Sequence, residues 1–347
     1  MNGCIDVMIN TTVYLQAIQS IASSIPVNNC KVLVTGATGL IGSCLVDVFI
    51  EANRTFGKQI TVYAVARNKK NLFDKFGSAE NVHCIPQDVV EPITIDGLDY
   101  IIHAASNADP QKYALFPAET ILTNILGAKS VLDYCKTHKT RVLLTSSFEV
   151  YGKLEQDFYS ENEYGLIDLN FIRSCYPESK RTAEMLFKSY FDEYNVNCVI
   201  ARLSSIYGPT MQLDDSKAHA QFLRNAILGK EIVLKSKGLQ RRTYCYVMDA
   251  VSGLLFVLFY GKKGEAYNVA NDKSVATIAE LASIIAELVG TKVIYTIPDD
   301  LEKKGYSIPQ NCILRVSKIK ELGWSGKYDL ITGLSETIAI MRTMIKN

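Results

Sequence analysis

At 347 residues with a formal net charge of +1, the chain is long enough for one large or two medium domains. Its charge balance gives no reason to expect nucleic acid or an acidic membrane surface as a partner. Hydrophobic residues make up 48% of the sequence, but charged and turn residues interrupt them, and no run approaches the roughly 20 apolar residues of a membrane span. We therefore expect a soluble protein with no membrane partner.

The N-terminal segment lacks the basic start and compact apolar block of a secretory signal, so we expect no export. Its apolar residues Val13, Ile18 and Ile21 predict a short leading helix. Nine cysteines are scattered without a C-x-x-C pair, and the four histidines are isolated. This pattern fits reduced thiols, so we expect a cytoplasmic protein with no disulfide framework and no bound metal.

The next part of the chain alternates short β-branched runs with helix-like stretches. Most of the runs are apolar nearly throughout, as parallel strands covered on both faces should be. The alternation predicts an α/β fold, a doubly wound parallel sheet of the Rossmann type with right-handed crossovers. The predicted strands are 31–35, 60–66, 82–85, 99–105, 141–147 and 197–203, and the helices between them are 40–53, 118–137 and 177–194.

The first predicted strand leads directly into TGATGLIG, which places three glycines at a strand-to-helix turn. Glycine permits a tight turn and a close approach of the backbone to a pyrophosphate, whose charge is stabilised by the helix N-terminus. The spacing is G-x-x-G-x-x-G, and its place in the chain predicts a dinucleotide site, with an ordinary tight turn as the alternative. The residues expected to contact the dinucleotide are Gly36, Thr38, Gly39, Leu40, Ile41 and Gly42.

The end of the second predicted strand bears on the choice between NAD and NADP. An acidic residue there bonds the ribose hydroxyls of NAD, whereas an arginine suits the extra phosphate of NADP. Arg67 follows the strand with Lys69 and Lys70 behind it, which favours NADP slightly over NAD. A basic loop on a solvated face is the alternative. Asp88, after the third strand, is a candidate to bond the adenine amine or simply to cap a turn.

After about residue 204 the alternation of strands and helices loosens. We interpret this half as a smaller C-terminal α/β region that binds substrate. The predicted division is an N-terminal helical extension (1–30), an NAD(P)-binding Rossmann domain (31–203) and a substrate-binding region (204–347) that is interleaved with the second. The helices predicted in the last region lie near 216–229, 249–260, 277–289 and 329–345.

The stretch RSCYPESKRTAE contains the one Tyr-x-x-x-Lys pattern of the chain, formed by Tyr176 and Lys180. Residues at i and i+4 share a helix face, and an ammonium beside a phenol favours the phenolate. Since an unperturbed phenol titrates at about 10, the lysine would help Tyr176 to act as a general base. Pro177 fits the first turn of a helix. On this pattern alone, a solvated helix face is the alternative.

With these motifs in order, the chain resembles an extended short-chain dehydrogenase/reductase of the NAD-dependent epimerase/dehydratase family, whose members modify nucleotide sugars. The resemblance runs from about residue 30 to the C-terminus. The motifs that carry it are TGATGLIG, HAASNADP (103–110), LLTSSFEVYG (143–152), CYPESKRTAE (175–184), ARLSSIYGP (201–209) and QRRTYCYVMDAVSG (240–253).

The resemblance implies roles for individual residues. Tyr176 would take a proton from the hydroxyl on the fourth carbon of the sugar while hydride passes to the nicotinamide, and Ser147 would steady the developing oxygen. Lys180 would lower the pKa of Tyr176 and hold the nicotinamide ribose. Arg242 would hold the diphosphate of the substrate. The residues implied to line the cofactor are His103, Ala104 and Ala105, together with Tyr176 and Lys180.

Glu149 separates the possible reactions. Similar family members with glutamate at this place are mostly 4,6-dehydratases and UDP-glucuronate decarboxylases, and the stretch that begins at Arg173 is most similar to the decarboxylases. The chain departs from the dehydratases in carrying Phe148 instead of aspartate, and Ser205 replaces a common substrate-contacting asparagine. We predict decarboxylase-like chemistry assisted by Glu149, with 4-epimerase or 4,6-dehydratase activity as alternatives.

A non-catalytic NAD(P)-binding sensor or scaffold is an alternative of another class. Such a protein would be free to lose Ser147, Tyr176 or Lys180, and all three residues are present. The sequence therefore favours an enzyme.

Assembly is also implied by the resemblance. Similar family members usually dimerise through two long helices per subunit, which here are 118–137 and 177–194. We expect a homodimer with a four-helix interface. Its candidate apolar contacts are Leu122, Ile125 and Leu186, although residues of this kind also serve in a core.

Overall fold

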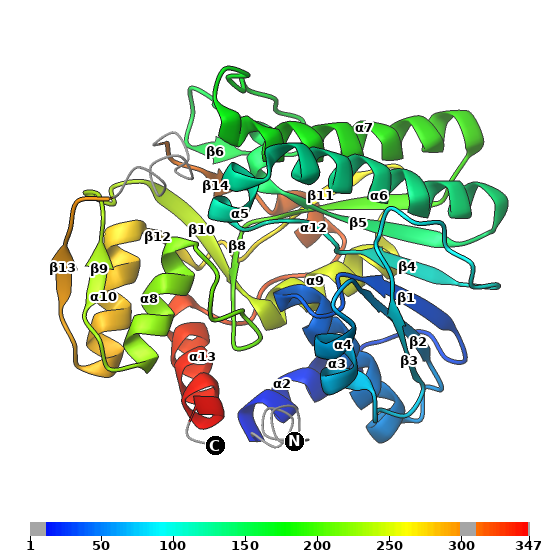
Figure 1. The fold of residues 1–347 in the computed structure, drawn as a ribbon, viewed down its shortest axis with the longest axis horizontal. Helices are drawn as coiled ribbons and strands as arrows, with labels where there is room; N and C mark the ends of the chain where they lie inside the picture. Colours follow the sequence, from blue (N-terminus) through cyan, green and yellow to red (C-terminus); the bar gives the residue numbers. More distant parts are fainter. Residues whose placement is uncertain (1–11, 299–309, 346–347) are drawn as a thin grey trace.

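The computed structural model describes residues 12–298 and 310–345. Its main sheet has seven parallel strands in the spatial order β11-β7-β5-β4-β1-β2-β3. Figure 1 shows this sheet between its two layers of helices. The order reverses at β1, which is typical of a doubly wound Rossmann sheet. The predicted fold class is confirmed. The strands are β1 (Lys31–Thr35), β2 (Thr61–Ala66), β3 (Val82–Pro86), β4 (Tyr100–His103), β5 (Arg141–Ser147), β7 (Cys198–Leu203) and β11 (Ala266–Val269).

Helices cover both faces of this sheet. In β1, Val32 and Val34 face one apolar core while Leu33 faces the other, so successive side chains serve both layers. Helices α6 and α7 pack together on one face, and α3 and α9 lie on the opposite face (Figure 1). Within the described residues, no helix is both long and apolar enough to cross a bilayer. The four helices just named are α3 (Leu40–Phe56), α6 (Pro117–Thr137), α7 (Cys175–Tyr194) and α9 (Val247–Tyr260). Two shorter helices follow strands of the sheet, α4 (Lys69–Phe76) and α5 (Pro110–Leu115).

The smaller region beside the sheet is built from short strands and further helices. Strand β10 pairs with β8 and β12, and it leads directly into α9 beneath the main sheet. The elements are β6 (Phe158–Tyr159), β8 (Ser205–Tyr207), β9 (Ile232–Leu234), β10 (Arg241–Tyr246), β12 (Val275–Thr277), β13 (Val293–Tyr295), β14 (Ile313–Leu314), α8 (Ala218–Ile227), α10 (Ile278–Val289), α12 (Ser317–Glu321) and α13 (Leu330–Ile345). The domain boundaries at 30 and 203 stay predictions, and both β11 and α9 come from beyond residue 203.

The leading helix α2 (Thr12–Ala22) packs against α3 and α9. Its Tyr14 hydroxyl donates to Asp47 Oδ2 on α3 at 2.6 Å, inside the core. Ile18 and Ile21 are buried, but Val13 is 38% exposed and so does not contribute to the apolar face. The first eleven residues of the expected extension lie outside the described residues.

Helix α4 is a correction to the sequence analysis. Lys69 and Lys70 were considered as part of a basic loop, but they form the first turn of this helix. The Asn68 side chain caps it by accepting a hydrogen bond from the backbone N–H of Asn71. Asparagine is a favoured N-cap residue. The segment after Asn68 has few apolar residues, so no apolar periodicity indicated the helix.

Candidate active site

A cavity of about 770 Å³ lies where the main sheet meets the smaller region. The carboxyl ends of β1, β2, β4, β5 and β7 open onto it, which is where ligands bind in sheets of this kind. The structure brings most of the predicted site residues to its wall. These are Gly36, Thr38, Gly39, Leu40, Ile41, Gly42, Arg67, Ala104, Ala105, Ser147, Glu149, Tyr176, Ser205 and Arg242.

The glycine turn fits a pyrophosphate by its geometry. Gly36 has φ of +68°, and a Cβ placed there would lie 2.8 Å from the backbone Cα of Ala105. Gly39 is the N-cap of α3 and offers no side-chain hydrogen bond, which leaves N–H groups of the first helical turn available. An anion at this end of a seventeen-residue helix would be favoured by those donors and by the helix dipole.

Replacing Gly36 with alanine is expected to weaken dinucleotide binding. Gly57 is a matched control because its φ is +61° and nothing lies within 4 Å of its Cβ position. Both alanines should cost about 1–2 kcal/mol of stability through backbone strain, and Gly36→Ala should cost more because its Cβ also meets the backbone of Ala105. Only Gly36→Ala also pushes against the segment at Ala105, so only that variant should lose affinity in a fluorescence titration with NAD(H) and NADP(H). Equal affinities in the two variants would contradict the close-approach argument.

Tyr176 is the second residue of α7 and lies at the cavity wall. Its ring stacks on Tyr113, with centroids 5.0 Å apart and an interplanar angle of 14°. Burial, and next the charge of Glu149, raise the pKa of Tyr176 above its usual value, while a hydrogen bond with Ser147 and the charge of Arg173 lower it. Tyr176 can therefore act as a base near neutral pH only if further positive charge lies beside its phenol.

Lys180 and His103 lie behind the lining residues. Lys180 is buried and donates from Nζ to the carbonyl oxygen of Thr145 at 2.9 Å. Burial lowers the pKa of Lys180 to about 8, so the side chain is still mainly cationic at neutral pH. His103 Nδ1 lies 3.0 Å from Thr35 Oγ1, and burial followed by the Lys180 charge lowers the pKa of His103 to about 3. His103 is thus neutral and ties β4 to β1.

Glu149 and Arg173 form a bidentate ion pair. Both distances between guanidinium nitrogen and carboxylate oxygen are 2.7 Å, and the side chains are only 15% and 10% exposed. The Arg173 guanidinium also lies 5.4 Å from the centre of the Tyr113 ring. Tyr113 in turn stacks on Tyr176. Burial alone would lower the pKa of Arg173, but the charge of Glu149 outweighs it. The pair holds a fixed carboxylate beside Tyr176.

The two residues considered for cofactor recognition have protein partners. Arg67 forms an ion pair with Glu119 at 2.9 Å, and both side chains are more than half exposed. Asp88 Oδ1 accepts from the backbone N–H of Val90 at 3.2 Å, the geometry expected of a turn cap. Asp88 lines a smaller neighbouring cavity. Both cofactor roles stay predictions.

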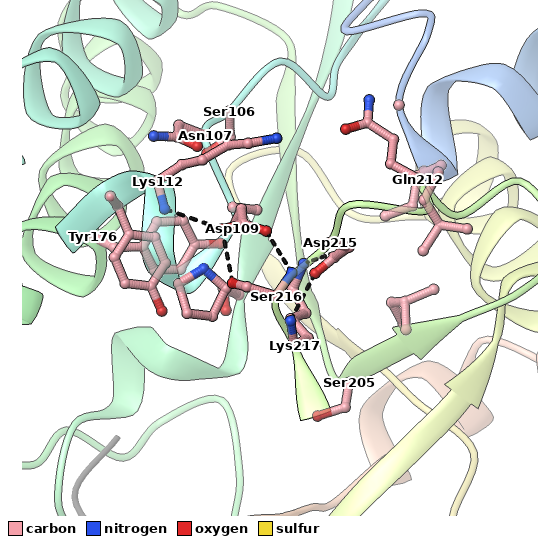
Figure 2. A pocket seen from close by; sticks show the side chains of 18 of the residues that line it. Ser106, Asn107, Asp109, Lys112, Tyr176, Ser205, Gln212, Asp215, Ser216 and Lys217 are labelled. Atoms are coloured by element: carbon pink, nitrogen blue, oxygen red, sulfur yellow. Dashed lines mark hydrogen bonds and ion pairs between the residues drawn. The ribbon is translucent and has the colours of Figure 1, made fainter. Parts of the chain in front are cut away.

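Asp109 was not found by sequence reasoning. Its carboxylate accepts from the backbone N–H groups of Gln111 and Lys112, and it also accepts from the N–H of Ser216 at 2.7 Å and the Ser216 hydroxyl at 2.8 Å. Figure 2 shows Asp109 beside Ser216, in the part of the cavity that lies between Tyr176 and Ser205. The Asp-Pro pair was a readable helix-start signal. The contact across more than 100 residues to the loop before α8 had no sequence signal.

Residues 32–270 match the NAD dependent epimerase/dehydratase family. This match spans more than half of the chain. The chain belongs to this family. The predicted family is confirmed, and the protein is an enzyme of it. UDP-glucuronic acid decarboxylase 6 of Arabidopsis thaliana is 34% identical over 312 residues, which cover 88% of this chain and 87% of that protein.

Solved structures of family members have the same fold. UDP-glucose 4-epimerase of Thermotoga maritima, with UDP-glucose, matches with a TM-score of 0.77 at 23% identity and covers 91% of this chain and 99% of its own. UDP-glucuronic acid 4-epimerase of Bacillus cereus, in complex with UDP-glucuronic acid and NAD, matches with a TM-score of 0.75 at 22% identity and covers 90% and 99%. At these identities the likeness establishes the fold alone.

Proposed function

We propose that the protein decarboxylates UDP-glucuronate with the help of a nicotinamide dinucleotide. The observation that carries this proposal is the buried Glu149–Arg173 pair beside Tyr176 at the cavity wall. A 4-epimerase has no need of such a carboxylate. The uridine nucleotide and the uronic acid are supported by the relatives named UDP-glucuronic acid decarboxylase, such as that of Arabidopsis thaliana.

In this proposal each residue of the chain moves or holds one group. Tyr176 accepts the proton of the hydroxyl on the fourth carbon of the sugar, and the Ser147 hydroxyl donates to the oxygen as charge develops. A dinucleotide held at the glycine turn would supply the hydride acceptor and, once reduced, the hydride donor. A keto group on the fourth carbon makes the sugar a β-keto acid, which loses carbon dioxide. Glu149, fixed by Arg173, relays a proton from solvent to the carbon that carried the carboxylate.

The pKa of Tyr176 supports a role for bound, oxidised dinucleotide in activating this base. Burial and Glu149 raise that pKa in the protein by itself. The positive charge of an oxidised nicotinamide would lower it. The base would thus become effective only when the acceptor for the hydride is already bound.

Phe148 argues against dehydration. Similar dehydratases have a proton-donating aspartate at this place, and the hydrocarbon ring of Phe148 has no proton to give. The ring instead faces Arg242, whose guanidinium carbon lies 5.6 Å from its centre. Dehydration and epimerisation are therefore outcomes of the test and not our proposal.

The test is incubation of the purified protein with UDP-glucuronate and with a panel of other UDP-, dTDP-, GDP- and CDP-sugars. Product mass and nicotinamide absorbance are followed. We expect UDP-glucuronate to lose the mass of carbon dioxide. Loss of the mass of water, or an unchanged mass with altered stereochemistry at the fourth carbon, would replace decarboxylation by dehydration or epimerisation. The Glu149→Gln variant should still oxidise the sugar in single turnover, but it should form the decarboxylated product more slowly.

For the dinucleotide, we propose that both NAD and NADP bind, with Arg67 giving a slight preference for NADP. The 2′-phosphate would compete with Glu119 for the guanidinium of Arg67. Glu119→Gln should therefore raise NADP affinity several-fold and leave NAD affinity unchanged, as measured by equilibrium titration. Tight NAD binding by the unmodified protein without measurable NADP binding would refute the role given to Arg67.

For assembly, we propose a homodimer through α6 and α7. Leu122 on α6 is 55% exposed and Met185 on α7 is 64% exposed, whereas Leu186 packs into the core. Leu122→Glu should shift the sedimentation of the protein from dimer to monomer at micromolar concentration. Ile331→Glu, at a 58% exposed position on α13, is the matched control and should leave the dimer intact. A monomeric unmodified protein would contradict this proposal.

The compartment is part of the same proposal. The eight cysteines in the described part of the chain are free thiols. Free thiols persist in a reducing environment. We propose that the protein acts in the cytoplasm, where cell fractionation would find it.

A further inference from the structure

One loop of the smaller region is bonded to the main sheet region at two separate places. Residues 210–216, here called the strap, lie between β8 and α8. Near the start of the strap, the Thr210 hydroxyl donates to the carbonyl oxygen of Leu40 at 2.7 Å. At its end, Ser216 donates to the carboxylate of Asp109 from both its backbone N–H and its hydroxyl.

The two attachment points lie on opposite sides of the crevice in which a dinucleotide is expected. Leu40 is the first residue of α3, the helix that follows β1. Asp109 is the N-cap of α5, in the segment that follows β4. Strands β1 and β4 are neighbours where the strand order reverses, and a dinucleotide binds in the crevice between the segments that leave two such strands. A strap bonded to both segments therefore crosses over that crevice.

The strap also forms part of the cavity wall. Its residues Gln212, Asp215 and Ser216 line the cavity, and so does Asp109. Figure 2 shows Ser216 beside Asp109, with Gln212 farther along the strap. A dinucleotide that extends from the glycine turn to Tyr176 would thus pass beneath the strap.

The Asp109 carboxylate is the main attachment of the strap at its Ser216 end. It is buried, and the two bonds from Ser216 are 2.7 and 2.8 Å long. Burial would raise the pKa of Asp109, but hydrogen bonds from Ser216 and Lys112 outweigh it and lower this pKa, so the carboxylate is ionised at neutral pH. Hydrogen bonds to an ionised acceptor are roughly twice as strong as neutral ones. The neighbouring ion pair of Lys112 with Asp214 is largely exposed and contributes little.

Other bonds attach the strap to α8, within the smaller region. The side chain of Gln221 donates to the carbonyl oxygen of Ser216 at 2.6 Å, and Arg224 donates to that of Leu213 at 2.8 Å. These bonds do not cross the crevice. If the bonds to Leu40 and Asp109 open, the strap can therefore leave the crevice while it stays attached to α8.

We propose that the strap closes over the bound dinucleotide and that Asp109 is its latch, so that a dinucleotide enters or leaves only when the bonds from Ser216 to Asp109 open. The latch joins protein groups to each other, so its strength sets the rate of exchange more than the affinity. Slow exchange suits a reaction in which one dinucleotide takes up a hydride and then returns it. The inference rests on the proposed function for the dinucleotide and does not depend on which sugar reacts.

The test is stopped-flow fluorescence with NADH and NADPH, in which mixing gives the association rate constant and displacement by excess oxidised dinucleotide gives the dissociation rate constant. Asp109→Asn is the most specific variant. Its side-chain oxygen can still cap α5 by accepting from Gln111 and Lys112, but its amide nitrogen cannot accept from the N–H of Ser216. Both rate constants should rise roughly 10–100-fold, the worth of a charged hydrogen bond. Their ratio, Kd, should change much less.

A second variant and a matched control accompany it. Ser216→Ala leaves the cap of α5 untouched and removes only the hydroxyl bond, so both rate constants should rise by a smaller factor. Asp329→Asn is the control, because Asp329 precedes α13, accepts from the backbone N–H of Thr332 and lies outside the cavity wall. Its exchange rates should equal those of the unmodified protein. Circular dichroism verifies that each variant is folded.

The outcomes separate this inference from the proposed function. Unchanged rate constants in both latch variants overturn the latch and leave the function standing. A faster dissociation with an unchanged association rate also overturns it, since Asp109 would then be a binding contact. If both rate constants rise as expected but UDP-glucuronate is not decarboxylated, the latch stands and the proposed reaction is wrong. If the unmodified protein binds neither dinucleotide, both are refuted.

Discussion

Replacing Tyr176 with phenylalanine is expected to lower kcat by about 10²–10⁴-fold, the usual contribution of a positioned general base. The ring should keep its stacked place on Tyr113, since the substitution removes only the hydroxyl. Without the phenolic oxygen, no group at this point of the wall can take the proton of the sugar hydroxyl. Steady-state rates with UDP-glucuronate and single-turnover absorbance of the nicotinamide measure the loss.

Tyr190→Phe is the matched control for this variant. Tyr190 lies on the same helix, and its hydroxyl donates to Asp133 on α6, away from the cavity. Its loss should leave the rate unchanged. Normal turnover by Tyr176→Phe would show that another group is the base. A loss of dinucleotide affinity equal to the loss in rate would show that the hydroxyl serves binding and not proton transfer.

Replacing Arg202 with methionine is expected to destabilise the protein by about 3–5 kcal/mol, because it leaves the Glu184 carboxylate buried without its partner. Arg202 on β7 is 3% exposed and donates to both carboxylate oxygens of Glu184 on α7. It also donates to the carbonyl of Glu161 at 2.8 Å, and Ser146 donates to Glu184 at 2.5 Å. Through Ser146 this network includes β5, the strand that ends at Ser147.

Urea unfolding followed by circular dichroism measures this loss. Lys70→Ala is the control, since it breaks an exposed pair with Asp74 and should change stability by less than about 1 kcal/mol. The double variant Arg202→Met with Glu184→Leu should recover much of the stability, because it removes both buried charges. If Arg202→Met unfolds at the same urea concentration as Lys70→Ala, the buried pair is not a major source of stability.

Local patterns in the sequence were sufficient to predict the main sheet and the glycine turn. Most strands of that sheet are largely apolar, and TGATGLIG follows the first one at once. Strand β11 was missed, because its four residues, AYNV, are too short and too polar to stand out. Its place beside β7 depends on tertiary pairing.

The site was predictable where its residues lie close together in sequence, and otherwise only through the family resemblance. The spacing of Tyr176 and Lys180 could be interpreted directly. The partnership of Glu149 with Arg173 joins residues 24 positions apart, and the stacking of Tyr113 on Tyr176 joins segments that no periodicity relates.

The late position of β11 in the chain governs the order in which the protein can fold. Until residues 266–269 have left the ribosome, the backbone of β7 presents an unpaired edge, and most of its side chains are apolar. More than 60 residues separate the two strands, so the nascent chain must carry that edge while α8 and β10 are being made. A chain that terminates near residue 203 would keep the edge permanently and would aggregate. Completion of the sheet therefore depends on the segment that follows α9.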